Sequence, residues 1–89
     1  EINKIMYMCT GSEANDLALR VAEAYTGGTG IIITQEAYHG TSALTSGCSP
    51  SLGAGQPLLP NVRLITAPDY YRHGGTPEEF TAWYASEMN

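Results

Sequence analysis

Residues 5–25, IMYMCTGSEANDLALRVAEAY, combine two patterns that predict an α/β fold. The first five residues form an apolar run without alternation, which is typical of a buried strand. After the turn at Thr10-Gly11-Ser12, the apolar residues recur with the period of one helix face, at Ala14, Leu17, Ala18, Val21, Ala22 and Tyr25. We therefore expect a buried strand that leads into an amphipathic helix over about residues 12–24, with the apolar face of that helix packed on a sheet.

Local signals mark both ends of this helix. Thr10 or Ser12 is suited to capping its start, and Glu13 completes a Thr-x-x-Glu capping box with Thr10. At the other end, Gly27-Gly28 supplies a residue able to adopt the positive φ that closes many helices. The helix is thus predicted from its caps as well as from its periodicity.

A second strand is predicted at Ile31-Ile32-Ile33-Thr34, because β-branched residues without alternation favour a central strand covered on both faces. Strand, helix and strand form a βαβ unit, which is almost always right-handed and brings the ends of both strands to one sheet edge. This arrangement would place Thr10-Gly11-Ser12 beside residues 36–40, EAYHG. We expect the two loops to form one candidate site.

The rest of the chain predicts further α/β elements. Residues 46–60 are rich in Gly, Ser and Pro, which indicates a long irregular connection and favours an active-site loop. Residues 62–67, VRLITA, are expected to form a third strand, and Thr76 is expected to cap a last helix with Pro77 in its first turn. We interpret residues 1–89 as part of one domain, cut from a longer chain.

Composition excludes several classes of function. A length of 89 residues allows one small domain at most. The net charge of -5, with only four Lys and Arg residues, argues against nucleic-acid binding, and no apolar run approaches the roughly 20 residues that span a bilayer. Two cysteines, Cys9 and Cys48, are too few for a disulfide scaffold and favour a reducing, cytoplasmic compartment.

The two loops carry the residues suited to binding. Gly11 and Ser12 follow a predicted strand and open a helix, where free amides and the helix dipole favour a phosphate, although a serine there is also an ordinary helix cap. Tyr38 and His39 follow the second strand; Tyr38 is placed to stack on a planar ligand, or else packs over the strand end while His39 caps a turn. Neither the dinucleotide fingerprint nor the P-loop pattern is present. Together the loops favour a planar, phosphorylated ligand.

The motif TGSEANDLALR, residues 10–20, followed by AYHGT, residues 37–41, closely resembles the class III aminotransferases, pyridoxal-phosphate enzymes of fold type I. The resemblance extends to APDYYR, residues 67–72, and covers essentially the whole chain. It implies that the chain is part of the large cofactor-binding domain of a homodimeric enzyme. It further implies that Gly11 and Ser12 hold the phosphate of pyridoxal 5'-phosphate, that Tyr38 stacks on the pyridine ring, and that His39 lines the same pocket.

Two parts of that family's site are missing from this sequence. The resemblance calls for a Schiff-base lysine and for an aspartate at the pyridinium nitrogen, both expected downstream of this segment. Lys4 is the only lysine, and six residues of the predicted strand would place it roughly 20 Å from the phosphate site. We assign no catalytic residue to this chain and no cofactor role to Asp69 or Arg72, whose expected structure is a surface turn with a weak ion pair.

Three interpretations of function follow. The first is a cofactor-docking segment of an aminotransferase, inactive by itself, whose parent moves an amino group from an amine or amino acid to a 2-oxo acid. The second is a flavodoxin-like module that holds a flavin phosphate at the same strand-to-helix turn, and the third is an inert fragment without independent activity. The sequence leaves open the donor and the acceptor, and also a lyase or racemase relative.

Overall fold

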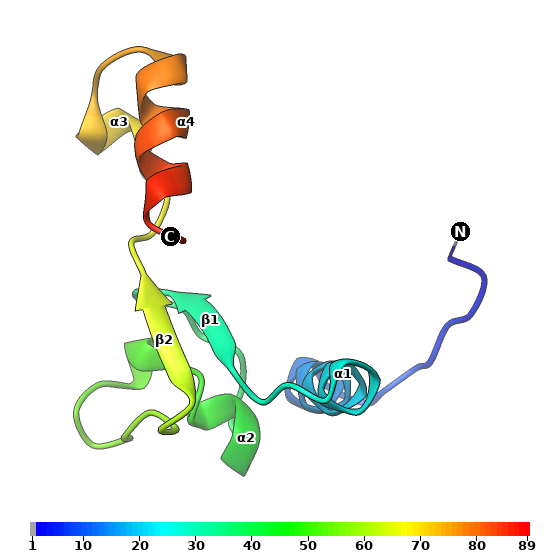
Figure 1. Cartoon of the computed structure of the whole chain (residues 1–89). Helices are drawn as coiled ribbons and strands as arrows, with labels where there is room; N and C mark the ends of the chain where they lie inside the picture. Colours follow the sequence, from blue (N-terminus) through cyan, green and yellow to red (C-terminus); the bar gives the residue numbers. More distant parts are fainter. Residues whose placement is uncertain (1) are drawn as a thin grey trace.

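The computed structural model describes residues 2–89 as a mixed α/β chain (Figure 1). Its elements in order are α1 (Gly11–Thr26), β1 (Ile31–Thr34), α2 (Ala43–Ser46), the 3-10 helix η1 (Pro50–Leu52), β2 (Val62–Ile65), α3 (Tyr70–His73) and α4 (Pro77–Ser86). The predicted fold class is confirmed. No helix within residues 2–89 is long and apolar enough to cross a membrane.

The sheet consists of β1 and β2, which run parallel in the register Ile31 to Val62 and Thr34 to Ile65. The connection between them passes through α2 and η1, so the parallel pair forms between the second and third predicted strands. The predicted third strand, 62–67, ends at Ile65. Because the two strands are parallel and Thr34 lies opposite Ile65, residues 34–36 and 65–67 lie at the same edge of the sheet.

The prediction of a buried strand over residues 5–9 is wrong. This segment is extended but unpaired, and Ile5, Met6 and Tyr7 are exposed. A strand needs a neighbour for its N–H and C=O groups, and within residues 2–89 β1 pairs only with β2. The predicted βαβ unit of residues 5–34 is therefore absent from the part of the chain that the structure describes, and Figure 1 shows residues 2–10 leading away from α1.

Helix α1 has the predicted cap residues at both ends, but it lacks the predicted packing and the predicted capping box, because Glu13 accepts the N–H of Cys9 and not that of Thr10. Thr10 Oγ1 accepts the Glu13 N–H at 3.2 Å, Glu13 Oε2 accepts the Cys9 N–H at 3.1 Å, and Gly27 closes the helix with φ of 70°. None of its residues is buried. Its apolar face lines an open groove of about 450 Å³ with Met6 and Met8, and it is Leu19, outside that face, that packs against the core. The expectation that this face packs on the sheet is wrong, because no strand from residues 5–9 lies beneath it.

The core is small and lies between the sheet and the irregular connection. Ile33, Cys48 and Val62 are buried, and Leu19, Ile31, Leu58 and Leu59 pack against them. Residues 46–60 are largely irregular, as predicted, apart from η1. At Gly47 a Cβ atom would be 2.5 Å from Leu59 Cγ, so the connection packs tightly on itself.

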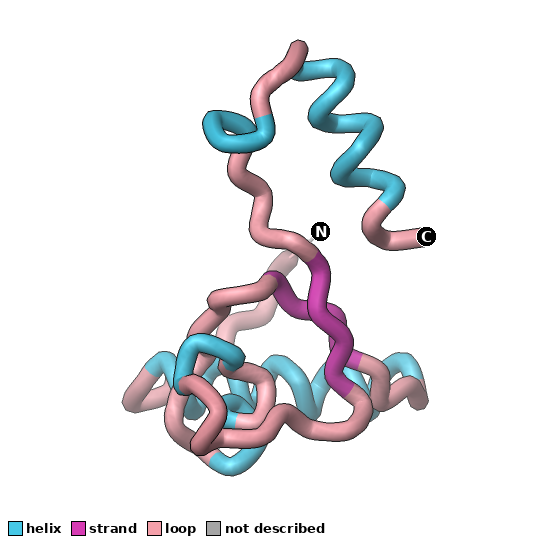
Figure 2. The backbone as a smooth tube through the Cα atoms, turned by 90° about the vertical axis from the view of Figure 1, so that its left-hand side faces the viewer, coloured by secondary structure: helices cyan, strands magenta, loops and turns pink. Residues whose placement is uncertain are grey.

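Helices α3 and α4 form a separate hairpin at one end of the molecule (Figure 2). Thr76 caps α4 and Pro77 lies in its first turn, as predicted, and Glu79 completes a capping box with Thr76. Aromatic contacts hold the hairpin, with His73 and Trp83 ring centroids 4.3 Å apart and Tyr70 meeting Phe80 edge-on at 5.4 Å. The radius of gyration of 15.3 Å exceeds the roughly 12 Å of a compact domain of this length, so the described residues form an open structure.

Candidate functional site

The two predicted loops meet, although residues 5–9 form no strand. Thr10, Gly11, Ser12 and Asn15, from the start of α1, line a hollow of about 350 Å³ together with Tyr38, His39 and Gly40, which follow β1. The juxtaposition predicted from the sequence is confirmed. It is made by direct hydrogen bonds between the loops and not by a shared sheet edge.

Two hydrogen bonds fasten the loop after β1 to α1. Asn15 Nδ2 donates to the His39 carbonyl at 2.8 Å, and the Thr41 N–H donates to Ser12 Oγ at 3.0 Å. Between them Gly40, with φ of 141°, approaches Ser12 so closely that a Cβ at position 40 would be 2.8 Å from Ser12 Cα. Only glycine allows this approach.

A third hydrogen bond holds the same loop from the opposite side. The His39 N–H donates to Ser49 Oγ at 2.8 Å, and Ser49 Oγ donates to the Thr45 carbonyl at 2.6 Å. Ser49 and Thr45 are fully buried. Sequence reasoning missed Asn15 and Ser49: the position of Asn15 one turn after Ser12 is a signal for the first, whereas nothing in the local sequence indicates the second.

The hollow offers hydrogen-bond donors to an anion. Among residues 2–89 the backbone N–H groups of Gly11 and Ser12 have no hydrogen-bond partner, and the space above Gly11 is open. The Ser12 hydroxyl accepts from Thr41 and keeps its own proton to donate. These donors lie at the positive end of the 16-residue helix α1, which favours a phosphate or a carboxylate.

Tyr38 adds an exposed ring to the hollow, which His39 also lines. Tyr38 is 56% exposed, so more than half of its surface is open to a ligand. The His39 Nε2 atom is inaccessible to solvent and has no hydrogen-bond partner within the described residues. A planar, phosphorylated ligand fits these groups, and the individual roles of Gly11, Ser12, Tyr38 and His39 stay predictions.

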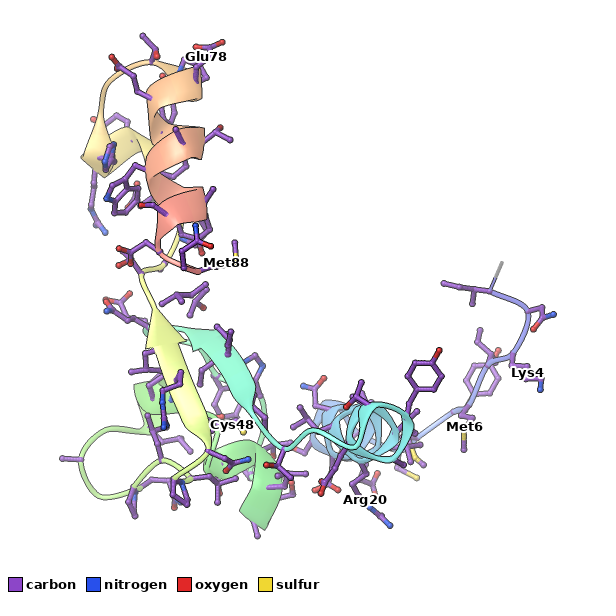
Figure 3. The ribbon with its side chains drawn as sticks, viewed as in Figure 1. Lys4, Met6, Arg20, Cys48, Glu78 and Met88 are labelled. Atoms are coloured by element: carbon purple, nitrogen blue, oxygen red, sulfur yellow. The ribbon has the colours of Figure 1, made fainter. Side chains whose placement is uncertain are left out.

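The other residues singled out in the sequence lie elsewhere. Asp69 caps α3 and forms an exposed ion pair with Arg72 at 3.2 Å, which confirms the predicted surface turn. Such a pair stabilises the fold by at most about 1 kcal/mol. Lys4 lies on the exposed N-terminal segment, away from the sheet (Figure 3), so the strand geometry used to place it does not apply.

Two further properties of the described residues bear on chemistry. Residues 2–89 contain no group of three or more His, Cys, Asp or Glu side chains placed to hold a metal ion. Burial raises the pKa of the Cys48 thiol, whereas Cys9 is exposed. Cys48 is therefore protonated at neutral pH and poorly suited to act as a nucleophile.

No family model matches the chain, but individual proteins do. It is 37% identical to an acetylornithine aminotransferase of Lactiplantibacillus plantarum over 73% of its length, and 43% identical to an ethanolamine-phosphate phospho-lyase homolog of Caenorhabditis elegans over 55%. An isoleucine 2-epimerase of Lentilactobacillus buchneri is 36% identical over 89% of the chain. The chain spans 18%, 10% and 19% of these relatives.

Solved structures give the same result. A phospholyase from Arthrobacter, in complex with phosphoethanolamine, matches 89% of the chain with a TM-score of 0.72 and 31% identity. An aminotransferase from Vibrio fluvialis in its PMP-bound form matches 91% with a TM-score of 0.69 and 32% identity. The chain covers 19% and 20% of these two structures, so it is similar to about one fifth of each enzyme.

Proposed function

We infer that the chain is a segment of a class III pyridoxal-phosphate-dependent aminotransferase, and we propose that it docks the phosphate end of the cofactor. The parent enzyme transfers an amino group from an amine or amino acid to a 2-oxo acid, and works as a cytoplasmic homodimer. The observation that carries this proposal is the convergence of the Gly11-Ser12 turn with Tyr38 and His39 around one hollow.

Gly11 and Ser12 bind the phosphate. Their two free N–H groups and the Ser12 hydroxyl supply three donors at the start of α1, which suits the oxygens of a phosphate dianion. The absence of a side chain at Gly11 keeps the approach open. Because the donors are held by the helix before any ligand arrives, little ordering is needed on binding.

Tyr38 and His39 position the ring. The exposed Tyr38 side chain stacks on one face of the pyridine, and His39 lines the same pocket. Pyridoxal phosphate, when bound, supplies the electron sink of the reaction. This chain orients that group, and the Schiff-base lysine comes from another part of the parent enzyme.

The reaction class is decided outside this segment. The relatives include an aminotransferase, a phospho-lyase and an epimerase, and the chain is more than 35% identical to each over the part that aligns. What they share here is a docking surface. The phospho-lyase is the second candidate, supported by the Arthrobacter structure at 31% identity, whereas no observation favours the flavodoxin alternative.

Absorbance titration of the protein that contains this chain tests the proposal. We expect pyridoxal phosphate to bind stoichiometrically and to be bleached by an amino donor, and pyridoxal without its phosphate to bind at least tenfold more weakly. Flavin mononucleotide serves as the competing ligand. Tight binding of flavin mononucleotide without binding of pyridoxal phosphate would exclude the proposal, as would equal affinity for pyridoxal and its phosphate ester.

A further inference from the structure

We propose that Asn15 and Ser49 are positioning residues, which hold the backbone of His39 from two sides and thereby fix Tyr38 and Gly40 at the hollow. This inference rests on the proposed function of that hollow. Neither residue is among the predicted cofactor-binding residues, and although Asn15 lines the hollow, its amide is bonded to the His39 carbonyl.

The two side chains bind the two polar groups of the same residue. The amide of Asn15 donates to the His39 carbonyl and the hydroxyl of Ser49 accepts the His39 N–H, each at 2.8 Å. The peptide groups before and after the His39 Cα are therefore both fixed. Tyr38 precedes the first of these groups and Gly40 follows the second, so both ends of the loop are constrained.

The Ser49 hydroxyl is itself held in place. It donates to the Thr45 carbonyl at 2.6 Å, and the Thr45 hydroxyl lies 2.8 Å from Ser42 Oγ. Ser42 in turn donates to the Asp16 carboxylate at 2.8 Å. Asp16 follows Asn15 in α1. The hydrogen bonds therefore connect α1 to His39 in two ways, directly from Asn15 and indirectly from Asp16 through residues 42–49, and we call this closed set of bonds the circuit.

This circuit gives the loop a defined position without a ligand. Ser49 and Thr45 are fully buried, where an unpaired polar group is costly, so the bonds between them are kept. Asn15 is exposed and fills no core space, so its bond to His39 serves to hold the loop and not to pack the fold. Preorganisation of this kind lowers the ordering cost of binding a cofactor ring.

The first measurement uses hydrogen exchange in the cofactor-free protein that contains this chain. Ser49→Ala and Asn15→Leu each remove one bond to His39, and Asn15→Leu keeps a similar side-chain size without adding a charge beside the proposed phosphate site. We expect amides of residues 38–41 to exchange about five- to tenfold faster in each variant, while residues 62–65 of β2 are unchanged. Ser51→Ala is the matched control, because Ser51 is exposed and its side chain makes no hydrogen bond within the described residues.

The second measurement uses pyridoxal phosphate as the probe. Both variants should raise its Kd about five- to tenfold and reduce the visible circular dichroism of the bound cofactor, which reports the orientation of its ring. Unchanged exchange at residues 38–41, or an equal increase in β2, would overturn the positioning role. Faster exchange with unchanged affinity and dichroism would overturn it too. The proposed function fails separately, if the unmodified protein does not prefer pyridoxal phosphate to pyridoxal.

Discussion

Gly40 and Ser12 are in such close contact that a Cβ atom at position 40 would be 2.5 Å from Ser12 Oγ. The two residues are 28 positions apart in sequence, and both line the hollow. Their contact places the loop that carries Tyr38 and His39 against the start of α1. Substitutions at this contact therefore affect the site directly.

Gly40→Ala should destabilise the protein by about 1 to 3 kcal/mol and also weaken cofactor binding, because it adds a clash to an unfavourable φ. Gly53→Ala is the control, since Gly53 has φ of 80° but open space around it. We expect Gly53→Ala to lower stability without changing the affinity for pyridoxal phosphate. Thermal unfolding and a pyridoxal phosphate titration check both variants, and equal effects of the two on affinity would contradict the contact.

Ser12→Ala should raise the Kd for pyridoxal phosphate about tenfold or more, the loss of one charge-assisted hydrogen bond worth about 1.5 to 3 kcal/mol. The affinity for phosphate-free pyridoxal should fall less in the same variant, because that ligand loses only the support that Ser12 gives the loop through Thr41 and not a phosphate contact. Titration with both ligands distinguishes loss of a phosphate donor from a general disturbance of α1. A parallel loss for both ligands would place the anion elsewhere.

Tyr38→Ala should weaken cofactor retention by about 1 kcal/mol beyond the loss of contact area, since that is the scale of an aromatic pair. Tyr71→Ala is a matched control, because Tyr71 is equally aromatic, highly exposed and part of α3. The measurement is cofactor dissociation during dialysis, followed by absorbance. Unchanged dissociation and spectrum in Tyr38→Ala would remove the stacking role.

Cys48 should make stability decrease with pH in the alkaline range. Because burial raises its pKa above the ordinary 9.0, the folded state keeps the proton after the unfolded chain has lost it. The contribution of the buried, protonated thiol to the free energy of unfolding is fully present below pH 9.0 and is lost as pH rises through the raised pKa of the folded state. Subtracting the pH profile of Cys48→Ala from that of the unmodified protein isolates this slope, and identical profiles would show that the thiol titrates normally.

At pH 8 a thiol reagent should modify the exposed Cys9 well before Cys48.

Residues 1–89 expressed alone should aggregate or remain partly unfolded. A two-stranded sheet is marginal in water, and the apolar face of α1 is open to solvent. Sedimentation and absorbance with added pyridoxal phosphate provide the test. A compact monomer that unfolds cooperatively and yields a stoichiometric, borohydride-trapped adduct at Lys4 would contradict both this prediction and the assignment of the lysine to another segment.

Local signals predicted what local interactions decide. The caps at Thr10, Gly27 and Thr76, and the strands at 31–34 and 62–65, follow from side-chain chemistry within a few residues. Whether residues 5–9 pair with another strand could not be predicted this way, because an apolar run forms a strand only when a neighbouring strand is present. The residues that line the hollow were predicted, but the residues that hold its loop in place were not. The role of Ser49 depends on its burial within an irregular connection, and such a connection leaves no periodic signal in the sequence.

The hydrogen bonds around the hollow also bear on how the protein is made. They join residues 10, 24 or 29 positions apart, and all of them lie within residues 12–49. Closing such short loops costs little chain entropy, so these contacts are kinetically accessible early, without waiting for distant segments. Because chains fold progressively during synthesis, we expect these contacts to be sampled on the ribosome once residue 49 emerges, and to become stable only when Leu58, Leu59 and Val62 complete the core.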